Sequence, residues 1–425
     1  MKVLWLTNIP LPEASELMNE KPVPFGGWLI KVSDYLSEQS EIKLSIAFPN
    51  LQSKDVNQLN GEKINYFSFP TVHMNDKESI RNNEHLKRIL KELKPDLVHI
   101  FGTEMAHSLA MVNACKEYGI CTVITIQGLV SKIAKHYTAG LPIKVQKSYT
   151  FRDFMKKDNI HQQQQKFEKR GMLEIEAIKI TNHIIGRTTW DKACSKQINN
   201  NARYHFCNET MREEYYKKTW SLEKCINYSI FISQGSYSIK GLHFVLEALP
   251  LILEKYSDAK VYIAGNDITS SDTLMEKMKR SSYAKYISRL IKTHKLRDHI
   301  IFTGILNEKQ MCERYLKSHV FVSPSTIENS PNSLGEAMLL GVPCVASAVG
   351  GVFDMLKHKE EGFIYQSDAS YMFAYYVCEI FENKELALKF SKNAREHALK
   401  THDPIRNTER LLDIYEAILG NPYTI

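Results

Sequence analysis

The chain alternates short apolar runs with longer amphipathic stretches. Runs rich in β-branched and aromatic residues predict strands at 2–7, 43–48, 64–68, 96–101, 121–126 and 183–187, then at 228–233, 319–323, 342–347 and 362–365, with further strand-to-loop units at 260–267 and 299–306. Between these runs lie stretches in which apolar residues recur every three or four positions, the spacing of one face of a helix, as at Leu242, Val245, Leu246 and Leu249. This alternation is typical of parallel sheets with crossover helices, so we predict an α/β protein.

Length and local composition predict two domains. A chain of 425 residues is too long for one ordinary core. The pattern becomes polar and irregular over 208–220, just before the second set of strands, and we place the hinge there. The predicted domains are therefore 1–222 and 223–403, followed by an amphipathic helix within 404–425.

The stretch 323–347 carries most of the candidate chemistry. A buried strand at 319–323 is followed by a loop and then by a predicted helix over 332–340, with Ser330 as N-cap and Pro331 at the first helical position. The first amide groups of a helix have no partner within the helix and attract anions. We therefore expect the backbone N–H groups of Asn332, Ser333 and Leu334 to bind a phosphate.

Two carboxylates flank this predicted anion site. Glu328 lies in the loop before the helix and Glu336 lies within the helix. Carboxylates accept hydrogen bonds from hydroxyl groups, so the pair suits a ligand with a central phosphate and a polyol at each end, such as a nucleotide sugar. The spacing alone is equally consistent with two ordinary surface acids.

The positions of Glu328, Glu336, Gly341-Val-Pro343 and Gly350-Gly351 resemble the signature of family 4 of the glycosyltransferases. The resemblance implies the GT-B fold, with two Rossmann-like doubly wound parallel-sheet domains and a cleft between them. It further implies that the C-terminal helix within 404–425 crosses back to the N-terminal domain. It also implies transfer of a sugar from a nucleotide-diphosphate donor with retention of configuration. In such a site Glu328 would hold donor sugar hydroxyls and Glu336 the ribose.

The same resemblance assigns further donor-binding positions in this chain. Lys240, just before a predicted helix, would neutralise the donor diphosphate and act with Glu328 in catalysis. Relatives carry an Arg near the place where this chain has Gly235 and Ser236. The remaining expected donor contacts are the Gly26-Gly27 loop and the backbone of Gly304 and Ile305 near the nucleobase. Taken without the resemblance, Lys240 is an ordinary solvated lysine and the Gly26-Gly27 pair a flexible turn.

Candidate acceptor residues lie at strand ends in the first half. Glu104 and His107 follow the strand at 96–101, at the sheet edge where open α/β sheets bind ligands. Gln127 stands where many relatives have a His, and a Gln cannot exchange a proton near neutral pH. Arg187 lies four residues before Asp191 and is expected to pair with it or to line the cleft.

The positive charge of the chain is concentrated in one segment. Residues 131–170 contain ten bases and three acids, which accounts for the whole net charge of +7. Aromatic and apolar residues are interleaved with these bases, namely Tyr137, Tyr149, Phe151, Phe154 and Met155. The segment suits contact with an anionic membrane face, although a solvated insertion would look similar. No nucleic-acid-binding motif accompanies the bases, so nucleic acid is not an expected partner.

The remaining features predict a cytoplasmic protein, peripheral at most on the inner face of the plasma membrane. The eight cysteines are scattered without metal-ligand spacing, which favours free thiols. The first apolar run is too short for a signal peptide, and no run is long enough to span a bilayer. An Asp-x-Asp motif is absent from the sequence, so neither a metal nor a cofactor is expected.

The expected activity is a retaining glycosyltransferase. Its donor would be a UDP- or GDP-linked sugar, and its acceptor a glycan or lipid-linked saccharide of capsule, exopolysaccharide or lipopolysaccharide assembly. Two alternatives stay open at this point. One is a GT-B sugar-nucleotide epimerase, and the other is a non-catalytic nucleotide-sugar-binding partner.

Overall fold

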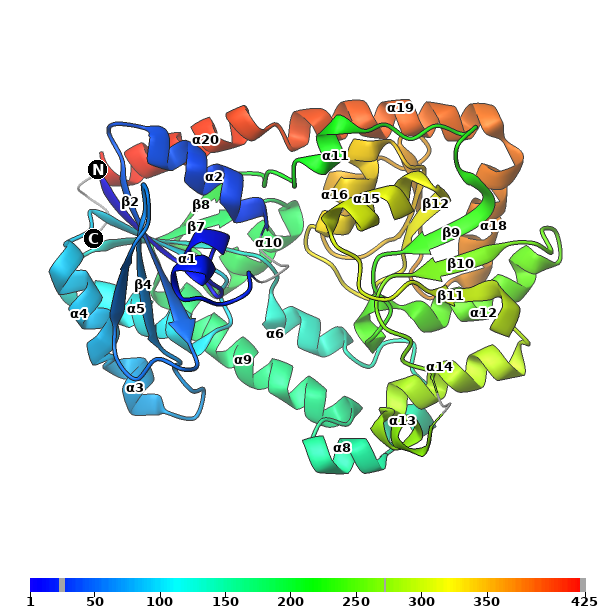
Figure 1. The fold of residues 1–425 in the computed structure, drawn as a ribbon, viewed down its shortest axis with the longest axis horizontal. Helices are drawn as coiled ribbons and strands as arrows, with labels where there is room; N and C mark the ends of the chain where they lie inside the picture. Colours follow the sequence, from blue (N-terminus) through cyan, green and yellow to red (C-terminus); the bar gives the residue numbers. More distant parts are fainter. Residues whose placement is uncertain (23–26, 271–272, 421–425) are drawn as a thin grey trace. The chain divides into compact units, whose positions relative to one another are not determined.

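The computed structural model describes residues 1–22, 27–270 and 273–420 and divides into two compact units (Figure 1). The first unit comprises Met1–Lys132, Glu168–Thr210 and His402–Ile425, and the second comprises Ile133–Phe167 and Met211–Thr401. The change from the first unit to the second at Thr210 and Met211 falls within the predicted hinge.

Two segments are grouped by packing rather than by sequence order. Most of the basic segment, residues 133–167, packs with the second unit, although the predicted boundary at residue 222 would place it in the first. The last helix packs with the first unit. A single boundary drawn along the chain misses the grouping of 133–167, because that grouping depends on which sheet a distant segment covers.

Among the described residues, the first unit forms an eight-stranded sheet in the order β3-β4-β2-β1-β5-β6-β7-β8. All its neighbours are parallel except β3 and β4. The strands are β1 (Lys2–Leu6), β2 (Lys43–Asn50), β3 (Asn57–Asn60), β4 (Asn65–Pro70), β5 (Leu97–Phe101), β6 (Cys121–Thr125), β7 (His183–Gly186) and β8 (Arg203–Phe206). The apolar pattern of the chain predicted all of these except β3 and β8, which are short and largely polar.

Helices cover both faces of this sheet, as a parallel sheet requires. They are α1 (Pro12–Leu17), α2 (Gly27–Glu38), α3 (Lys77–Arg81), α4 (Glu84–Leu93), α5 (Ala106–Tyr118), α10 (Thr189–Ile198) and α20 (Pro404–Leu419), with α6 (Val130–Ile133) and α9 (Ile160–Ile180) at the junctions with the second unit.

A buried polar contact fixes α20 on the first sheet. The Trp5 indole N–H donates to the Tyr415 hydroxyl at 3.0 Å, and His99 Nδ1 lies 2.5 Å from the same oxygen. His99 Nε2 lies 2.6 Å from Thr125 Oγ1, so both ring nitrogens are engaged. Burial lowers the pKa of His99 to about 3. His99 is therefore a buried core residue whose two ring nitrogens both have partners.

The second unit forms a six-stranded parallel sheet in the order β11-β10-β9-β12-β13-β14 among the described residues. Its strands are β9 (Ile226–Ile232), β10 (Lys260–Ile263), β11 (Ile300–Phe302), β12 (Ser318–Ser323), β13 (Cys344–Ser347) and β14 (Gly362–Tyr365). The centre of the sheet is buried on both faces, so β12 reads as a continuous apolar run at Val320, Phe321 and Val322.

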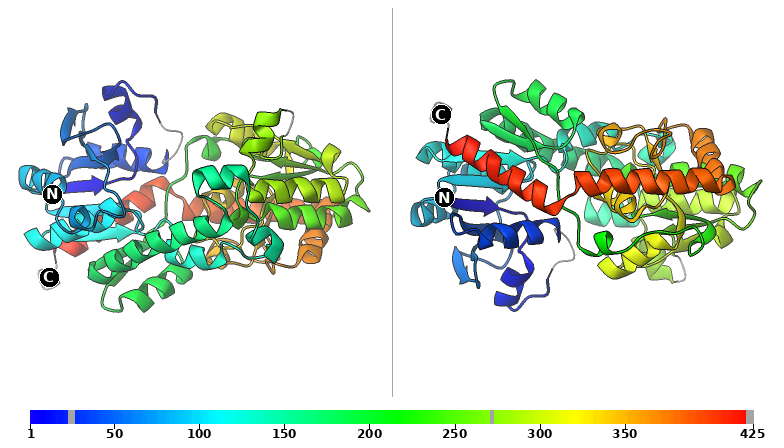
Figure 2. Two further views of the ribbon diagram at one scale, coloured as in Figure 1. Left: turned by 90° about the horizontal axis from the view of Figure 1, so that it is seen from below. Right: turned by 90° about the horizontal axis from the view of Figure 1, so that it is seen from above.

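The helices of the second unit come from both of its chain segments. They are η1 (Ala134–His136), α7 (Ile143–Gln146), α8 (Phe151–Lys156), α11 (Glu214–Lys217), η2 (Ser238–Lys240), α12 (Leu242–Leu253), α13 (Leu274–Lys279), α14 (Ser282–Thr293), η3 (Arg297–His299), α15 (Glu308–Leu316), α16 (Asn332–Leu340), α17 (Val352–Met355), α18 (Ser370–Glu382) and α19 (Lys384–Thr401). The right-hand view of Figure 2 shows α19, in orange to red, as one long helix of this unit, and it packs on α16. Among the described residues, every helix is too short or too polar to span a bilayer.

Strand order defines a ligand-binding edge in each unit. In the second sheet the chain runs outward from β9 through β10 to β11, then returns to the other side of β9 as β12. The loops after β9 and β12 therefore leave the sheet in opposite directions, which opens a crevice at their carboxyl ends. In the first sheet the corresponding point lies between β1 and β5.

Candidate functional site

Helix α16 begins where the ligand-binding edge of the second sheet lies. It spans Asn332–Leu340, as predicted, but the predicted cap is wrong: Pro331 is the N-cap, and no side chain caps the helix. Pro331 has extended backbone angles, so it is the cap and not the first helical residue. The Leu334 N–H donates to the Pro331 carbonyl at 3.0 Å, so it is not one of the free amides that we expected. Asn332 and Ser333 hold the two first helical positions, whose N–H groups have no acceptor within a helix.

Lys240 and Glu328 meet at this edge. Lys240 ends the η2 turn after β9, and Glu328 lies in the loop between β12 and α16. The Lys240 Nζ atom is 2.6 Å from Glu328 Oε1, and the Ser325 hydroxyl donates to the same oxygen at 2.7 Å. Burial by itself lowers the pKa of the Lys240 amine, but Glu328 and Tyr237 together raise it above the ordinary value. The amine is therefore charged at neutral pH.

Two glycines allow the loops that carry these side chains to approach closely. Gly241 has φ +70° and Gly350 has φ +50°, both in the left-handed region. A Cβ on Gly241 would lie 1.8 Å from the Pro324 carbonyl oxygen, and a Cβ on Gly350 would lie 1.8 Å from the Glu328 carbonyl oxygen. Any side chain at either position would push the Lys240 turn or the Glu328 loop out of place.

Glu336 lies inside the second unit and is held by two partners. The Arg212 guanidinium is 2.8 Å from Glu336 Oε1, and the Tyr315 hydroxyl donates to Glu336 Oε2 at 3.3 Å and to the Ser333 carbonyl at 3.0 Å. Burial raises the pKa of Glu336, and Arg212 opposes that rise. Arg212 was not predicted, because it lies in the irregular stretch at the hinge, where no spacing rule identifies a partner for Glu336.

Four of the other predicted donor-binding residues occupy loops at the same edge of the sheet. Gly235 and Ser236 follow β9 and precede the Lys240 turn. Gly304, with φ +76°, follows the edge strand β11 and pairs with Gly265 in an isolated bridge. Ile305 is mostly exposed. Gly26 lies outside the described residues, and Gly27 is the first residue of α2 in the first unit.

In the first unit, the predicted acceptor residues lie near the carboxyl ends of β1 and β5. The His107 Nε2–H donates to Asn8 Oδ1 at 2.7 Å, and burial lowers the pKa of His107 to about 4. A neutral, buried imidazole of this kind positions Asn8 and is poorly suited to exchange protons at pH 7. Glu104 is half-buried and accepts from the Thr103 N–H at 3.2 Å.

Gln127 and Arg187 both contact Glu209, an acid that the sequence did not identify. The Gln127 amide donates to Glu209 Oε1 at 2.7 Å, and Arg187 Nη1 lies 2.5 Å from Glu209 Oε2. The Arg187 side chain pairs with Glu209 and not with Asp191, so the first of its two expected roles is wrong and the second, lining the cleft, stays a prediction. Asp191 instead accepts from the Arg187 backbone N–H at 2.9 Å and from the Tyr204 hydroxyl at 2.6 Å. Glu209 comes from the predicted hinge, so only the folded chain identifies it.

These observations define the class of fold. Each unit is a Rossmann-like parallel sheet with helices on both faces, and the chain has the GT-B fold predicted from its sequence. The solved structure of Anabaena Alr3699/HepE in complex with UDP and glucose aligns with a TM-score of 0.68 at 14% identity, covering 98% of this chain and 100% of that one. At this identity the likeness concerns the fold alone.

Sequence comparison connects the second unit with glycosyltransferases. Residues 213–397, less than half of the chain, match the family model described as glycosyl transferases group 1. The protein YtcC of Bacillus subtilis (strain 168), named as a glycosyltransferase, is 28% identical over 207 residues, or 48% of each chain. An Escherichia coli protein named UDP-Gal:alpha-D-GlcNAc-diphosphoundecaprenol alpha-1,3-galactosyltransferase is 28% identical over 104 residues, or 24% of this chain and 27% of that one. The alignments span about half or less of these relatives.

Proposed function

We propose that this protein is a retaining glycosyltransferase that moves a sugar from a UDP- or GDP-linked donor to a glycan or lipid-linked saccharide in cell-surface polysaccharide biosynthesis. The observation that carries the proposal is the contact between Lys240 and Glu328 beside the N-terminus of α16. At this edge of the sheet lie a cation (Lys240), a carboxylate that can accept hydrogen bonds from hydroxyl groups (Glu328) and the first amides of α16. A diphosphate with an attached sugar needs these three kinds of partner.

In this proposal the second unit stabilises the leaving group. The bond between the anomeric carbon and the donor diphosphate breaks, and the negative charge that develops on the diphosphate is met by Lys240 and by the amides of Asn332 and Ser333. The acceptor oxygen forms the new bond on the same face of the sugar. Its proton passes to a donor phosphate oxygen, and the nucleotide diphosphate is released.

Glu328 has a binding role in this scheme. Its Oε1 already contacts the Lys240 ammonium and the Ser325 hydroxyl, which makes this oxygen a poor nucleophile. The remaining carboxylate oxygen is suited to accept hydrogen bonds from donor sugar hydroxyls. Glu336 would hold the ribose, with Arg212 and Tyr315 fixing its orientation. Lysine and helix amides supply the charge that a metal supplies elsewhere, so we propose a metal-independent reaction.

Relatives support the proposed substrates. The Escherichia coli relative is named for a UDP-linked donor and a lipid-diphosphate acceptor, and the Anabaena structure contains UDP and glucose. We therefore favour UDP over GDP as the carrier, and a lipid-linked saccharide as the acceptor. Such an acceptor would place the enzyme at the inner face of the plasma membrane.

A thermal-shift panel tests the donor site. Purified protein is heated with UDP-, GDP-, ADP- and CMP-linked sugars, and a ligand that binds only the folded chain raises its Tm. We expect a UDP-sugar to give the largest rise and Glu336→Ala to reduce it. If no nucleotide sugar raises the Tm, or if the rise is unchanged in Glu336→Ala, the proposed donor site is wrong.

Radiolabelled donor then separates the three candidate activities. Transfer of label to an added lipid-linked saccharide supports the glycosyltransferase. Conversion of the donor sugar into another sugar nucleotide without an acceptor indicates an epimerase instead. Binding without turnover of either kind indicates a nucleotide-sugar-binding partner.

A further inference from the structure

Two short helices of the second unit expose apolar side chains together. Helices α8 and α13 are in contact. Phe151 is 57% exposed, Phe154 65% and Met155 65% on α8, while Met275 is 65% and Met278 45% exposed on α13. Tyr149 packs beside Phe154 in an edge-to-face contact. We call the outward face made by these residues of α8 and α13 the α8–α13 surface. Tyr137, which the sequence analysis grouped with them, is buried and lies outside this surface.

Exposed lysines neighbour these apolar residues along the chain. Lys156 and Lys157 follow Met155, and Lys277 and Lys279 alternate with Met278 in the sequence. All four lysines are exposed. The α8–α13 surface therefore combines bulky apolar side chains with positive charge.

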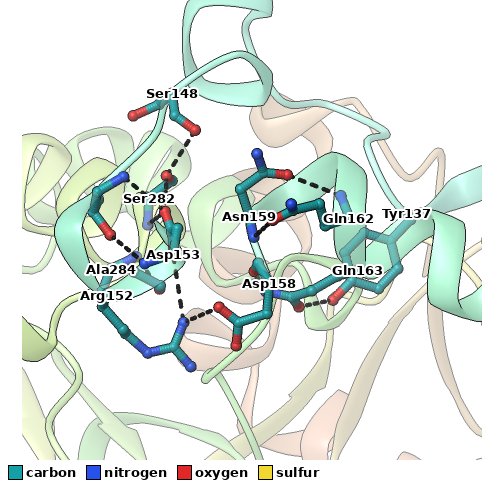
Figure 3. A network of polar contacts seen from close by, with 12 residues as sticks. Tyr137, Ser148, Arg152, Asp153, Asp158, Asn159, Gln162, Gln163, Ser282 and Ala284 are labelled. Atoms are coloured by element: carbon teal, nitrogen blue, oxygen red, sulfur yellow. Dashed lines mark hydrogen bonds and ion pairs between the residues drawn. The ribbon is translucent and has the colours of Figure 1, made fainter. Parts of the chain in front are cut away.

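The acids of these two segments are turned away from the surface. Asp153 is fully buried and accepts from the Ser282 backbone N–H at 3.1 Å and from the Ser282 hydroxyl (Figure 3). Asp158 lies 2.8 Å from Arg152 Nη1 in the same network. Glu276 closes a capping box with Thr273 at the start of α13. Every acid in 151–158 and 273–280 thus has an inward or local partner.

The same network orients α8. Ser282 is the first residue of α14, and its two bonds to Asp153 tie the middle of α8 to that helix. Thr150 and Asp153 form a capping box that fixes the start of α8. With Asp153 fixed inward, the helical spacing directs Phe151, Phe154 and Met155 outward.

We propose that the α8–α13 surface docks on an anionic lipid bilayer. Large apolar side chains exposed side by side mark an interaction site, and lysines at its rim complement anionic headgroups. A protein partner fits less well, because lysine is depleted at protein–protein interfaces. The phenylalanine and methionine side chains enter the acyl boundary, and the lysine amines remain at the headgroups.

The inward faces of the same helices line a cavity of about 490 Å³ within the second unit. Its polar lining includes Tyr137, Arg152, Asp158, Gln163 and Glu276. Docking through the outward faces brings this cavity next to the headgroups. This consequence rests on the proposed function, because a polar cavity beside the headgroups suits the saccharide of a lipid-linked acceptor.

Vesicle co-sedimentation of the full chain tests the docking surface. Vesicles of phosphatidylcholine alone are compared with vesicles that also contain phosphatidylglycerol, at low and high salt. We expect binding to the anionic vesicles, weakened by salt. Lys156→Gln with Lys277→Gln should weaken it about fivefold for each lysine removed. Phe154→Ser with Met155→Ser should weaken it by about tenfold or more.

Matched changes elsewhere in the second unit serve as controls. Tyr371 and Leu388 are 63% and 48% exposed on other helices, and Lys389 is exposed, so Tyr371→Ser with Leu388→Ser, and Lys389→Gln, should bind as the wild type. The proposal is overturned if anionic vesicles are not bound, or if the surface variants bind as well as these controls. The UDP-sugar thermal shift of each variant reports separately on the donor site.

Discussion

The Lys240 amine lies 2.6 Å from the Glu328 carboxylate, although the two residues are 88 positions apart. The contact exists because β9 and β12 are neighbouring parallel strands, so the loops that follow them start side by side at the same edge of the sheet. The contact links two roles that the resemblance assigns separately, neutralising the diphosphate (Lys240) and holding the donor sugar (Glu328). A donor diphosphate must share Lys240 with Glu328, so a change at one residue alters the other.

Lys240→Ala should lower kcat for sugar release or transfer about 10²- to 10³-fold, since removing one preorganised group from a leaving-group site typically has this effect. Steady-state kinetics with the donor found by thermal shift measures it. Lys240→Arg keeps the charge and should retain more activity. If Lys240→Ala and Lys240→Arg both turn over like the wild type, Lys240 does not stabilise the leaving group.

The coupling between Lys240 and Glu328 can be measured with a double-mutant cycle. We expect Lys240→Ala with Glu328→Gln to lose less activity than the two single losses combined, because each single change already breaks the shared contact. Strict additivity of the two effects on kcat/KM would show that the residues act independently.

Gly350→Ala should destabilise the protein and weaken donor binding. The new methyl group would lie 1.8 Å from the Glu328 carbonyl oxygen, so the Glu328 loop must move. Gly119 is a matched control, because its φ is +64° but nothing lies within 4 Å of an added Cβ. Gly119→Ala should cost only the left-handed strain of about 1–2 kcal/mol. Urea unfolding of both variants makes the comparison, and equal losses would contradict the steric account.

Arg212→Met should destabilise the protein more at pH 8 than at acid pH. Burial raises the pKa of Glu336, and loss of Arg212 raises it further. Above the ordinary Glu pKa, near 4.5, the folded state then binds more protons than the unfolded state, so stability falls as pH rises through the folded pKa. Denaturant unfolding from pH 5 to pH 8 measures the difference. Glu336→Gln on the Arg212→Met background should remove the added pH dependence.

The wild-type protein should lose stability as pH falls below about 6.5, in part through His107. The pKa of His107 is lowered to about 4 in the fold, so the unfolded chain binds more protons between that value and 6.5. A shift of this size corresponds to about 3 kcal/mol, fully lost only below the folded pKa. His107→Gln keeps a donor for Asn8 and should flatten the pH dependence of unfolding. An unchanged slope would contradict the neutral, buried assignment.

Elements with a strong local sequence pattern were predicted correctly. The strands β1, β9 and β12 and the helix α16 were predicted because a buried parallel strand and a helix end each leave a strong local signal. The polar strands β3 and β8 were missed, since their hydrogen bonds to a neighbouring strand leave no apolar pattern. The N-cap of α16 was placed one residue early because Pro331 is acceptable both as a cap and as a first helical residue.

The partners of the candidate residues could not be predicted from the local sequence pattern. Glu209 and Arg212 lie in a stretch without periodicity, yet they engage Arg187 and Glu336. An ion pair between residues more than a hundred positions apart, such as Arg212 and Glu336, has no local signature. Likewise, α8 and α13 lie in contact although more than a hundred residues separate them, and Asp153 ties α8 to the start of α14, the helix that follows α13.

The apolar strands of both sheets, the bounds of α16 and the positions of Glu328 and Glu336 around its start were determined by the sequence itself, because periodicity and helix-end chemistry act over a few neighbouring residues. The grouping of 133–167 with the second unit, the Lys240–Glu328 contact and the one-sided α8–α13 surface were decided only by tertiary structure. These features depend on which strands become neighbours and which side chains are buried. Both are decided by packing between segments far apart in the chain, which leaves no local sequence pattern.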